Sequence, residues 1–238
     1  SRINHAIRDA AAAVELRAAA TGAINALAHE LCRAVDLRES DIVDLTVCGN
    51  TAMHHLLLGL PVRQLGRSPF VAALREALDV KARDLGLAIA PGAYLHAAPN
   101  IGGFVGGDHV AALLATAPLW ESAAAAIVMD IGTNTELSLV HGDGIITVSC
   151  PSGPALEGGH IACGMRAAGG AIERIAITPD GVEARVIGET KAVGICGSGV
   201  LDAVAALRGA GLIDQGGRLL AGHPVIREID GKPAVALA

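Results

Sequence analysis

The sequence predicts an α/β protein whose centre is a run of three successive strands. Residues 7–35 are rich in alanine and carry leucine and valine at four-residue intervals, which is typical of helix. Residues 42–48 form a short apolar run, which predicts a buried strand. Beyond residue 124, three strand-like segments follow one another with only short turns between them. Because helices and strands do not alternate strictly, we expect a mixed α/β architecture rather than a doubly wound parallel sheet.

In the first half of the chain, small polar residues and glycines mark the ends of the predicted elements. Gly22 is expected to divide the helix over 7–35 into two. After the first strand, Asn50 or Thr51 is a natural N-cap, and Gly59 ends the short helix that it begins. The other elements predicted here are a short helix over 71–78, a strand region over 87–98 and a helix from Asp108 to about Ala115.

The second half of the chain begins with the three-strand meander, predicted over 124–128, 136–140 and 145–149. A glycine-interrupted helix is expected over 161–172. The later elements predicted are strands over 175–177, 182–186 and 192–193, a helix after Gly199 whose apolar face carries Leu201, Val204 and Leu207, and a strand pair within 224–238.

Composition and charge argue against several classes of protein. The chain has 238 residues, 52% of them apolar, which is enough for one large domain or two lobes and argues against disorder. The net charge of −6 and the aromatic content of 2% argue against a nucleic-acid partner. No apolar run reaches the length of a membrane span. The five cysteines form no C-x-x-C pair, which fits reduced thiols in a cytoplasmic protein.

The turn after the first strand of the meander is the strongest candidate for a functional site. Gly132 lets a ligand approach the backbone, and Thr133 and Asn134 add two small polar side chains. Such a turn can hold an anionic oxygen with its N–H groups. Asp130 can hold the cation that accompanies a polyphosphate, and we expect it to contact Mg²⁺ through water and to act in catalysis. An ordinary hairpin turn with a solvated Asp and Asn is the alternative that these residues leave open.

Other loops carry polar residues next to predicted helix starts. Asn50 and Thr51 follow a strand, where ligand clefts form in α/β proteins, but an N-cap explains both without a ligand. Asp108 follows a glycine-rich loop and either caps its helix or orients metal or water for catalysis. The pair Gly197 and Ser198 opens a helix whose free N–H groups could receive a phosphate, although close helix packing explains it as well. Glu157 is expected to cap a following helix, with a role on attacking water as the alternative.

Several motifs in order give the sequence a specific resemblance. Residues 130–136 (Asp-Ile-Gly-Thr-Asn-Thr-Glu) resemble the second phosphate motif of the acetate kinase, sugar kinase, heat-shock chaperone and actin superfamily. Segments 48–60, 99–108, 152–158 and 194–199 resemble signatures of the ATPase domain of reductive activators of corrinoid proteins. Thr135 and Leu156 depart from that pattern, which usually has Gly and Phe at these positions.

The resemblance implies an incomplete ribonuclease H-like fold of the actin and sugar-kinase ATPase type. Residues 1–120 would belong to a first lobe and residues 121–238 to a second. ATP and Mg²⁺ are the implied cofactors, with a [2Fe–2S] cluster only on a domain absent from this chain. The residues expected to hold the nucleotide are Gly132, Thr133, Asn134, Asn50, Thr51, Gly197 and Ser198. Because the first phosphate hairpin and the nucleotide-base motif are not found, we expect the middle part of an ATPase domain.

The implied activity is ATP hydrolysis that drives an electron onto an inactive Co(II) corrinoid protein. The expected partner is therefore a corrinoid protein of a methyltransferase system, and a homodimer is left open. Two alternatives also stay open. The chain could be a non-catalytic lobe that docks the corrinoid protein, or a relative of the sugar and acetate kinases.

Overall fold

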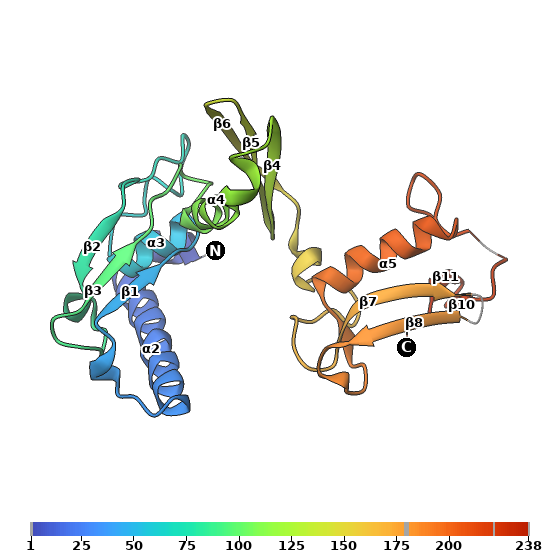
Figure 1. The fold of residues 1–238 in the computed structure, drawn as a ribbon, viewed down its shortest axis with the longest axis horizontal. Coiled ribbons are helices and arrows are strands. Elements are labelled where there is room, and N and C mark those ends of the chain that lie inside the picture. Colours follow the sequence, from blue (N-terminus) through green and yellow to red (C-terminus); the bar gives the residue numbers. More distant parts are fainter. Residues whose placement is uncertain (1, 179–180, 221, 238) are drawn as a thin grey trace. The chain divides into compact units, whose positions relative to one another are not determined.

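The computed structural model describes residues 2–178, 181–220 and 222–237 (Figure 1). The chain divides into two compact units, which are described one at a time. The first comprises residues 1–130 with 136–149, and the second comprises residues 131–135 with 150–238. Within the described residues, no helix combines the length and the apolar character needed to cross a bilayer.

The first unit packs helices against a three-stranded sheet. Its elements are α1 (Arg2–Arg8), α2 (Ala10–Ala34), β1 (Asp44–Val47), α3 (Thr51–Leu58), β2 (Leu78–Lys81), β3 (Tyr94–Ala97) and α4 (Gly107–Trp120). The strand order is β1–β3–β2, with β1 parallel and β2 antiparallel to β3 (Figure 1). Leu95 on the middle strand is fully buried and belongs to the same core as Leu57 of α3 and Ile24 of α2.

Helix α2 runs without interruption through Gly22, so the predicted division at this residue is wrong. The break lies at Asp9, whose carboxylate accepts the N–H of Ala11 and begins α2. Side chains on either side of Gly22 anchor the helix to the loop after β2: the Thr21 hydroxyl donates to the Leu85 carbonyl, and the Asn25 amide donates to the Gly86 carbonyl. These tertiary contacts outweigh the low helix propensity of one glycine.

Gly22→Ala is expected to stabilise the protein by about 0.5–1 kcal/mol, because alanine restricts the unfolded chain and suits a helix interior. Gly22 is exposed, and a Cβ added there would meet nothing within 4 Å. Urea unfolding followed by circular dichroism measures the change. Gly59→Ala is the matched control and should destabilise, because Gly59 ends α3 with a φ of 68°. A loss of stability in Gly22→Ala would contradict the prediction.

Helix α3 begins and ends as predicted. The Asn50 side chain accepts the N–H of Met53 at 2.9 Å, and Gly59 adopts the left-handed conformation after the last turn. Asn50 therefore acts as the N-cap.

The helix expected over 71–78 is not formed. Nε2 of His55, on α3, accepts the N–H groups of Ala73 and Leu74, at 3.0 and 3.4 Å. The His55 ring thus holds the backbone of Ala73 and Leu74 against α3, and the segment over 71–78 stays without helix.

The three-strand meander is confirmed. Its strands are β4 (Ala125–Ile131), β5 (Asn134–His141) and β6 (Gly144–Pro151), in the order β4–β5–β6. His109, on α4, is fully buried, and its Nε2 contacts the Ser138 hydroxyl of β5 at 2.7 Å. Ser138 in turn contacts the Thr147 hydroxyl of β6 at 2.7 Å. The buried Ser138 hydroxyl and the half-buried Thr147 hydroxyl therefore tie β5 and β6 to the start of α4.

The second unit contains a three-stranded sheet, one helix and a hairpin. Its elements are η3 (Pro154–Glu157), β7 (Ala171–Thr178), β8 (Gly181–Val186), β9 (Gly194–Ile195), α5 (Gly197–Gly209), β10 (Ile226–Ile229) and β11 (Lys232–Val235). The sheet has the order β8–β7–β9, and α5 runs beside it (Figure 1). The antiparallel pair β10–β11 confirms the strand pair predicted within 224–238.

Near its start, helix α5 lies so close to β7 that no side chain fits at Gly199. A Cβ at Gly199 would overlap the carbonyl oxygen of Ile172, and the Asp202 carboxylate accepts the N–H of Ile175 at 2.6 Å. The buried face is accordingly Gly199, Ala203 and Leu207. The predicted apolar face is wrong in part, because Leu201 and Val204 are 49% and 53% exposed.

The helix expected over 161–172 is also not formed. The N–H of Met165 donates to the Ile195 carbonyl, and the N–H of Ile195 donates to the Cys163 carbonyl, both at 2.9 Å. Gly164 thus forms an isolated parallel bridge with Ile195 of β9, and the residues around it are irregular. This brings residue 166 beside the start of α5.

Candidate active site

A cavity of about 740 Å³ in the second unit brings together several of the predicted site residues. Gly197 and Ser198 line it from the first turn of α5, and Glu157 lines it from the end of η3. Arg166 completes the polar lining. The volume falls within the range that small-molecule sites occupy.

The first turn of α5 presents free backbone donors to this cavity. No side chain caps the helix, and its first turn carries no acidic residue. Within the described residues, the N–H groups of Gly197, Ser198 and Gly199 have no acceptor. These donors and the positive end of the helix dipole favour an anion at this place.

Close packing holds η3 against this helix start. A Cβ at Gly197 would overlap the carbonyl oxygen of Leu156, so a side chain at this position would push η3 away from α5. Both features expected from the sequence are therefore present at the start of α5: Gly197 packs closely against η3, and the N–H groups of the first turn are free.

Arg166 adds the positive charge that the free donors lack. The side chain is exposed, and its guanidinium has no hydrogen bond or ion pair among the residues that the structure describes. An Arg guanidinium can bind phosphate oxygens with two parallel hydrogen bonds. The cavity thus combines a cation with a helix N-terminus, which suits a phosphate group.

The turn at Gly132 is tied to η3 by a side-chain contact. The Thr133 hydroxyl donates to the carboxylate of Glu157, and the Thr133 carbonyl accepts the N–H groups of Ser152 and Gly153. The N–H of Gly132 is used within the turn, where it donates to the Asn134 carbonyl at 3.0 Å. In the described part of the chain the N–H of Thr133 has no acceptor and the exposed Asn134 side chain has no hydrogen bond, so these groups of the turn can reach a ligand.

Glu157 does not act as a helix cap. η3 ends at this residue, and the helix expected after it is not formed. Its exposed carboxylate is held over the turn instead, where a Cβ added at Gly132 would lie 3.8 Å from the Glu157 Oε1 atom. The expectation that Glu157 caps a helix is therefore wrong.

Asp130 lies next to the end of β4, just before the turn in the sequence. Its side chain is half-buried and has no hydrogen-bond or ion-pair partner among the described residues. No group of three or more His, Cys, Asp or Glu that could hold a metal is found in the described part of the chain. A single unpaired carboxylate fits Mg²⁺, which keeps several waters and shares its shell with substrate phosphates.

The remaining candidates lie together in the first unit. The Thr51 hydroxyl, on a residue 2% exposed, donates to the Gly102 carbonyl at 2.7 Å, while Asn50 caps α3. The Asp108 carboxylate accepts the N–H of His109, and the Asp108 N–H donates to the Gly49 carbonyl. Each residue thus has a local structural role, and none of these contacts tests a role in ligand binding.

Comparison with known proteins identifies the family. A model of the RACo middle region matches residues 1–117, and a model of the C-terminal domain of RACo, the ASKHA domain, matches residues 124–238. The chain belongs to the RACo family. The resemblance found in the sequence is thereby confirmed, and with it the actin and sugar-kinase type of fold.

Individual RACo relatives agree with this assignment. The solved structure of a reductive activator for corrinoid, iron–sulfur protein matches with a TM-score of 0.86 and 35% identity, over 100% of this chain and 38% of that chain. The corrinoid activation enzyme RamQ of Eubacterium limosum is 36% identical over 82% of this chain and 33% of its own length. A reductase of Methanosarcina barkeri named for a Co(II) methylated-amine-specific corrinoid protein is 37% identical over 49% of this chain and 26% of its own. This chain therefore spans about a third of the length of these relatives.

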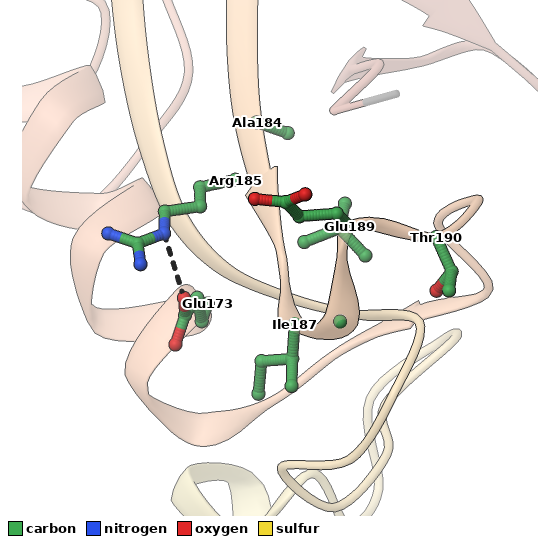
Figure 2. Close-up of a pocket in the computed structure, with 8 residues that line it drawn as sticks. Glu173, Ala184, Arg185, Ile187, Glu189 and Thr190 are labelled. Atoms are coloured by element: carbon green, nitrogen blue, oxygen red, sulfur yellow. Dashed lines mark ion pairs between the residues drawn. The ribbon is translucent and has the colours of Figure 1, made fainter.

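A second hollow in this RACo-family chain holds none of the predicted residues. It has a volume of about 880 Å³ and lies over β8 and the short helical turn Ile187–Glu189 (Figure 2). Arg185 in this hollow is paired with Glu173 at 3.2 Å, and Glu189 adds another acidic residue (Figure 2). In this hollow Arg185 is thus neutralised by Glu173, and Glu189 adds a further negative charge, which disfavours the binding of phosphate.

Arg166 is the functional candidate that motif reasoning missed. The sequence does carry a signal for it, because Arg166 is the only Lys or Arg between Arg83 and Arg174. That interval holds two of the four family segments, 99–108 and 152–158, and the turn at Gly132. A single cation in such a segment could have been recognised as a phosphate contact without the structure.

Proposed function

We propose that the second unit binds the phosphates of MgATP in the cavity at the start of α5, and that the protein hydrolyses ATP. One observation carries the proposal. One cavity is lined by unpaired Arg166, by Gly197 and Ser198 with their free N–H groups, and by Glu157, whose carboxylate accepts the Thr133 hydroxyl. Phosphoryl transfer depends mainly on such positioning and charge stabilisation, and little on covalent chemistry by the protein.

In this proposal Asp130 holds Mg²⁺, mainly through water, and the metal neutralises charge on the phosphates. Thr133 and Asn134 contact phosphate oxygens through the turn. Asn50, Thr51 and Asp108 remain proposed contacts of the nucleotide or its metal. The observation in favour of Asp130 is its unpaired, half-buried carboxylate.

Arg166→Ala tests the proposed site, with Arg185→Ala as the matched control in the other hollow. Calorimetry with MgATP should show Arg166→Ala weakened about tenfold, which corresponds to ~1.4 kcal/mol and to one charge-assisted hydrogen bond. Arg185→Ala should bind as the unchanged protein does. If Arg185→Ala weakens binding and Arg166→Ala does not, the nucleotide occupies the hollow over β8. If the unchanged protein binds no MgATP, the proposal fails.

We also propose that the ATPase serves the reductive activation of a corrinoid protein. The support is the names of the relatives, which are a corrinoid activation enzyme and a corrinoid protein reductase. Titration of a Co(II) corrinoid protein into this chain should then show binding that changes between MgATP and MgADP. Binding to the corrinoid protein without any nucleotide binding would favour a docking lobe instead. Transfer of phosphate to a small hydroxyl or carboxyl acceptor would favour a kinase relative.

A further inference from the structure

We infer that Glu157 is the residue that orients and deprotonates the water that attacks the γ-phosphate. The inference rests on the proposed function and assigns a catalytic group within the same cavity. Glu157 is an exposed carboxylate that lines this cavity, and its partner in the structure is the Thr133 hydroxyl of the turn at Gly132.

The carboxylate is held in place from two directions. It ends η3, whose Leu156 carbonyl packs against Gly197 so closely that a Cβ there would overlap it. On the other side the Thr133 hydroxyl donates to it. A catalytic group needs to be fixed by its surroundings before substrate arrives, and these contacts fix Glu157 beside the turn that receives phosphate.

Charge argues against a role for Glu157 in binding the nucleotide. A carboxylate repels phosphate, and a neutral side chain could accept the Thr133 hydrogen bond equally well. An anionic group beside a phosphate cradle is therefore a cost to binding unless it takes part in the reaction. A carboxylate within reach of water can act as a general base, which typically contributes about 10²- to 10⁴-fold to the rate.

The proposed reaction consumes one molecule of ATP and one of water. The water oxygen forms a bond to the γ-phosphorus, and the bond from that phosphorus to the β–γ bridging oxygen breaks. ADP leaves with the bridging oxygen and its electron pair. One water proton passes to Glu157 and is later released to solvent, which reaches this exposed side chain. The other proton stays on the inorganic phosphate.

Glu157→Gln separates catalysis from structure, because Gln keeps the shape and still accepts the Thr133 hydrogen bond but cannot take up a proton. We expect turnover to fall by about 100-fold or more while MgATP binds at least as tightly. Because the lost charge faces the γ-phosphate, affinity for MgATP should rise relative to MgADP, which equilibrium titration measures without turnover. Glu157→Asp should recover part of the lost turnover. Glu173→Gln, the same change in the other hollow, should alter neither quantity.

The outcomes separate the two proposals. Unchanged turnover in Glu157→Gln, or a joint loss of MgATP affinity and thermal stability, would overturn the role of Glu157 and leave the nucleotide site in place. Nucleotide binding without hydrolysis in the unchanged protein would overturn both this role and the proposed hydrolysis of ATP, and would leave only the nucleotide site in place. An unchanged protein that binds no MgATP would remove the proposed function itself.

Discussion

Gly197→Ala is expected to abolish measurable MgATP binding. The added Cβ would overlap the carbonyl oxygen of Leu156, so η3 must move away from the start of α5. That movement displaces Glu157 and opens the cavity that Gly197 and Ser198 line. The overlap is with backbone rather than with a flexible side chain, so we expect a stability loss of about 1–3 kcal/mol, as for other over-packed sites. Calorimetry with MgATP and thermal unfolding measure the two effects.

Gly209→Ala is the matched control, because it makes the same change at the other end of α5. Gly209 is exposed, and a Cβ there would meet nothing within 4 Å. It should leave affinity unchanged and shift stability by less than about 0.5 kcal/mol. If Gly197→Ala binds MgATP as tightly as the unchanged protein, the contact between η3 and α5 does not shape the site, and the proposed cavity is the wrong one.

The sequence predicted the parts of the fold that local signals determine. Asn50 and Gly59 bound α3 as expected, because a cap and a left-handed glycine act within one turn of the chain. The meander followed from alternating strands and short turns. The family motifs located the turn at Gly132 and the start of α5. The structure places Gly197 and Ser198 around one cavity with Glu157, and Thr133 of the turn donates to Glu157.

The predictions failed where distant contacts decide the conformation. The segment over 161–172 contains enough apolar residues for a helix, but Met165 is paired with β9. The buried face of α5 was misjudged because periodicity follows large apolar residues, whereas close packing on β7 requires Gly199 and Ala203. Neither the partner strand nor the spacing between helix and sheet can be inferred from the local sequence.

His55 is the second residue whose change should have a large effect. It is fully buried, its Nδ1 contacts the Thr51 carbonyl at 2.8 Å, and its Nε2 accepts the N–H groups of Ala73 and Leu74. This pattern requires the neutral ring with its proton on Nδ1, because a proton on Nε2 would face two backbone donors. His55→Ala should cost about 2–4 kcal/mol, since it leaves buried donors unpaired and a cavity behind. Denaturant unfolding at pH 8 measures the loss, and the exposed His141 supplies the control His141→Ala, which should change little.

The same ring should make stability depend on pH. Burial lowers the pKa of His55, against a smaller opposite effect of its hydrogen bond to Thr51, and burial together with the nearby His55 lowers the pKa of His54. When the folded pKa lies below the unfolded value of about 6.5, the unfolded chain binds more protons as pH falls, so stability is complete above about pH 6.5 and decreases below it. The denaturant concentration at the unfolding midpoint should therefore decrease as the pH is lowered from about 7.5 to 5, and the decrease should be smaller in His55→Ala. An equally steep decrease in that variant would show that other groups cause the pH dependence. It would contradict the expected contribution of the neutral His55 ring to stability.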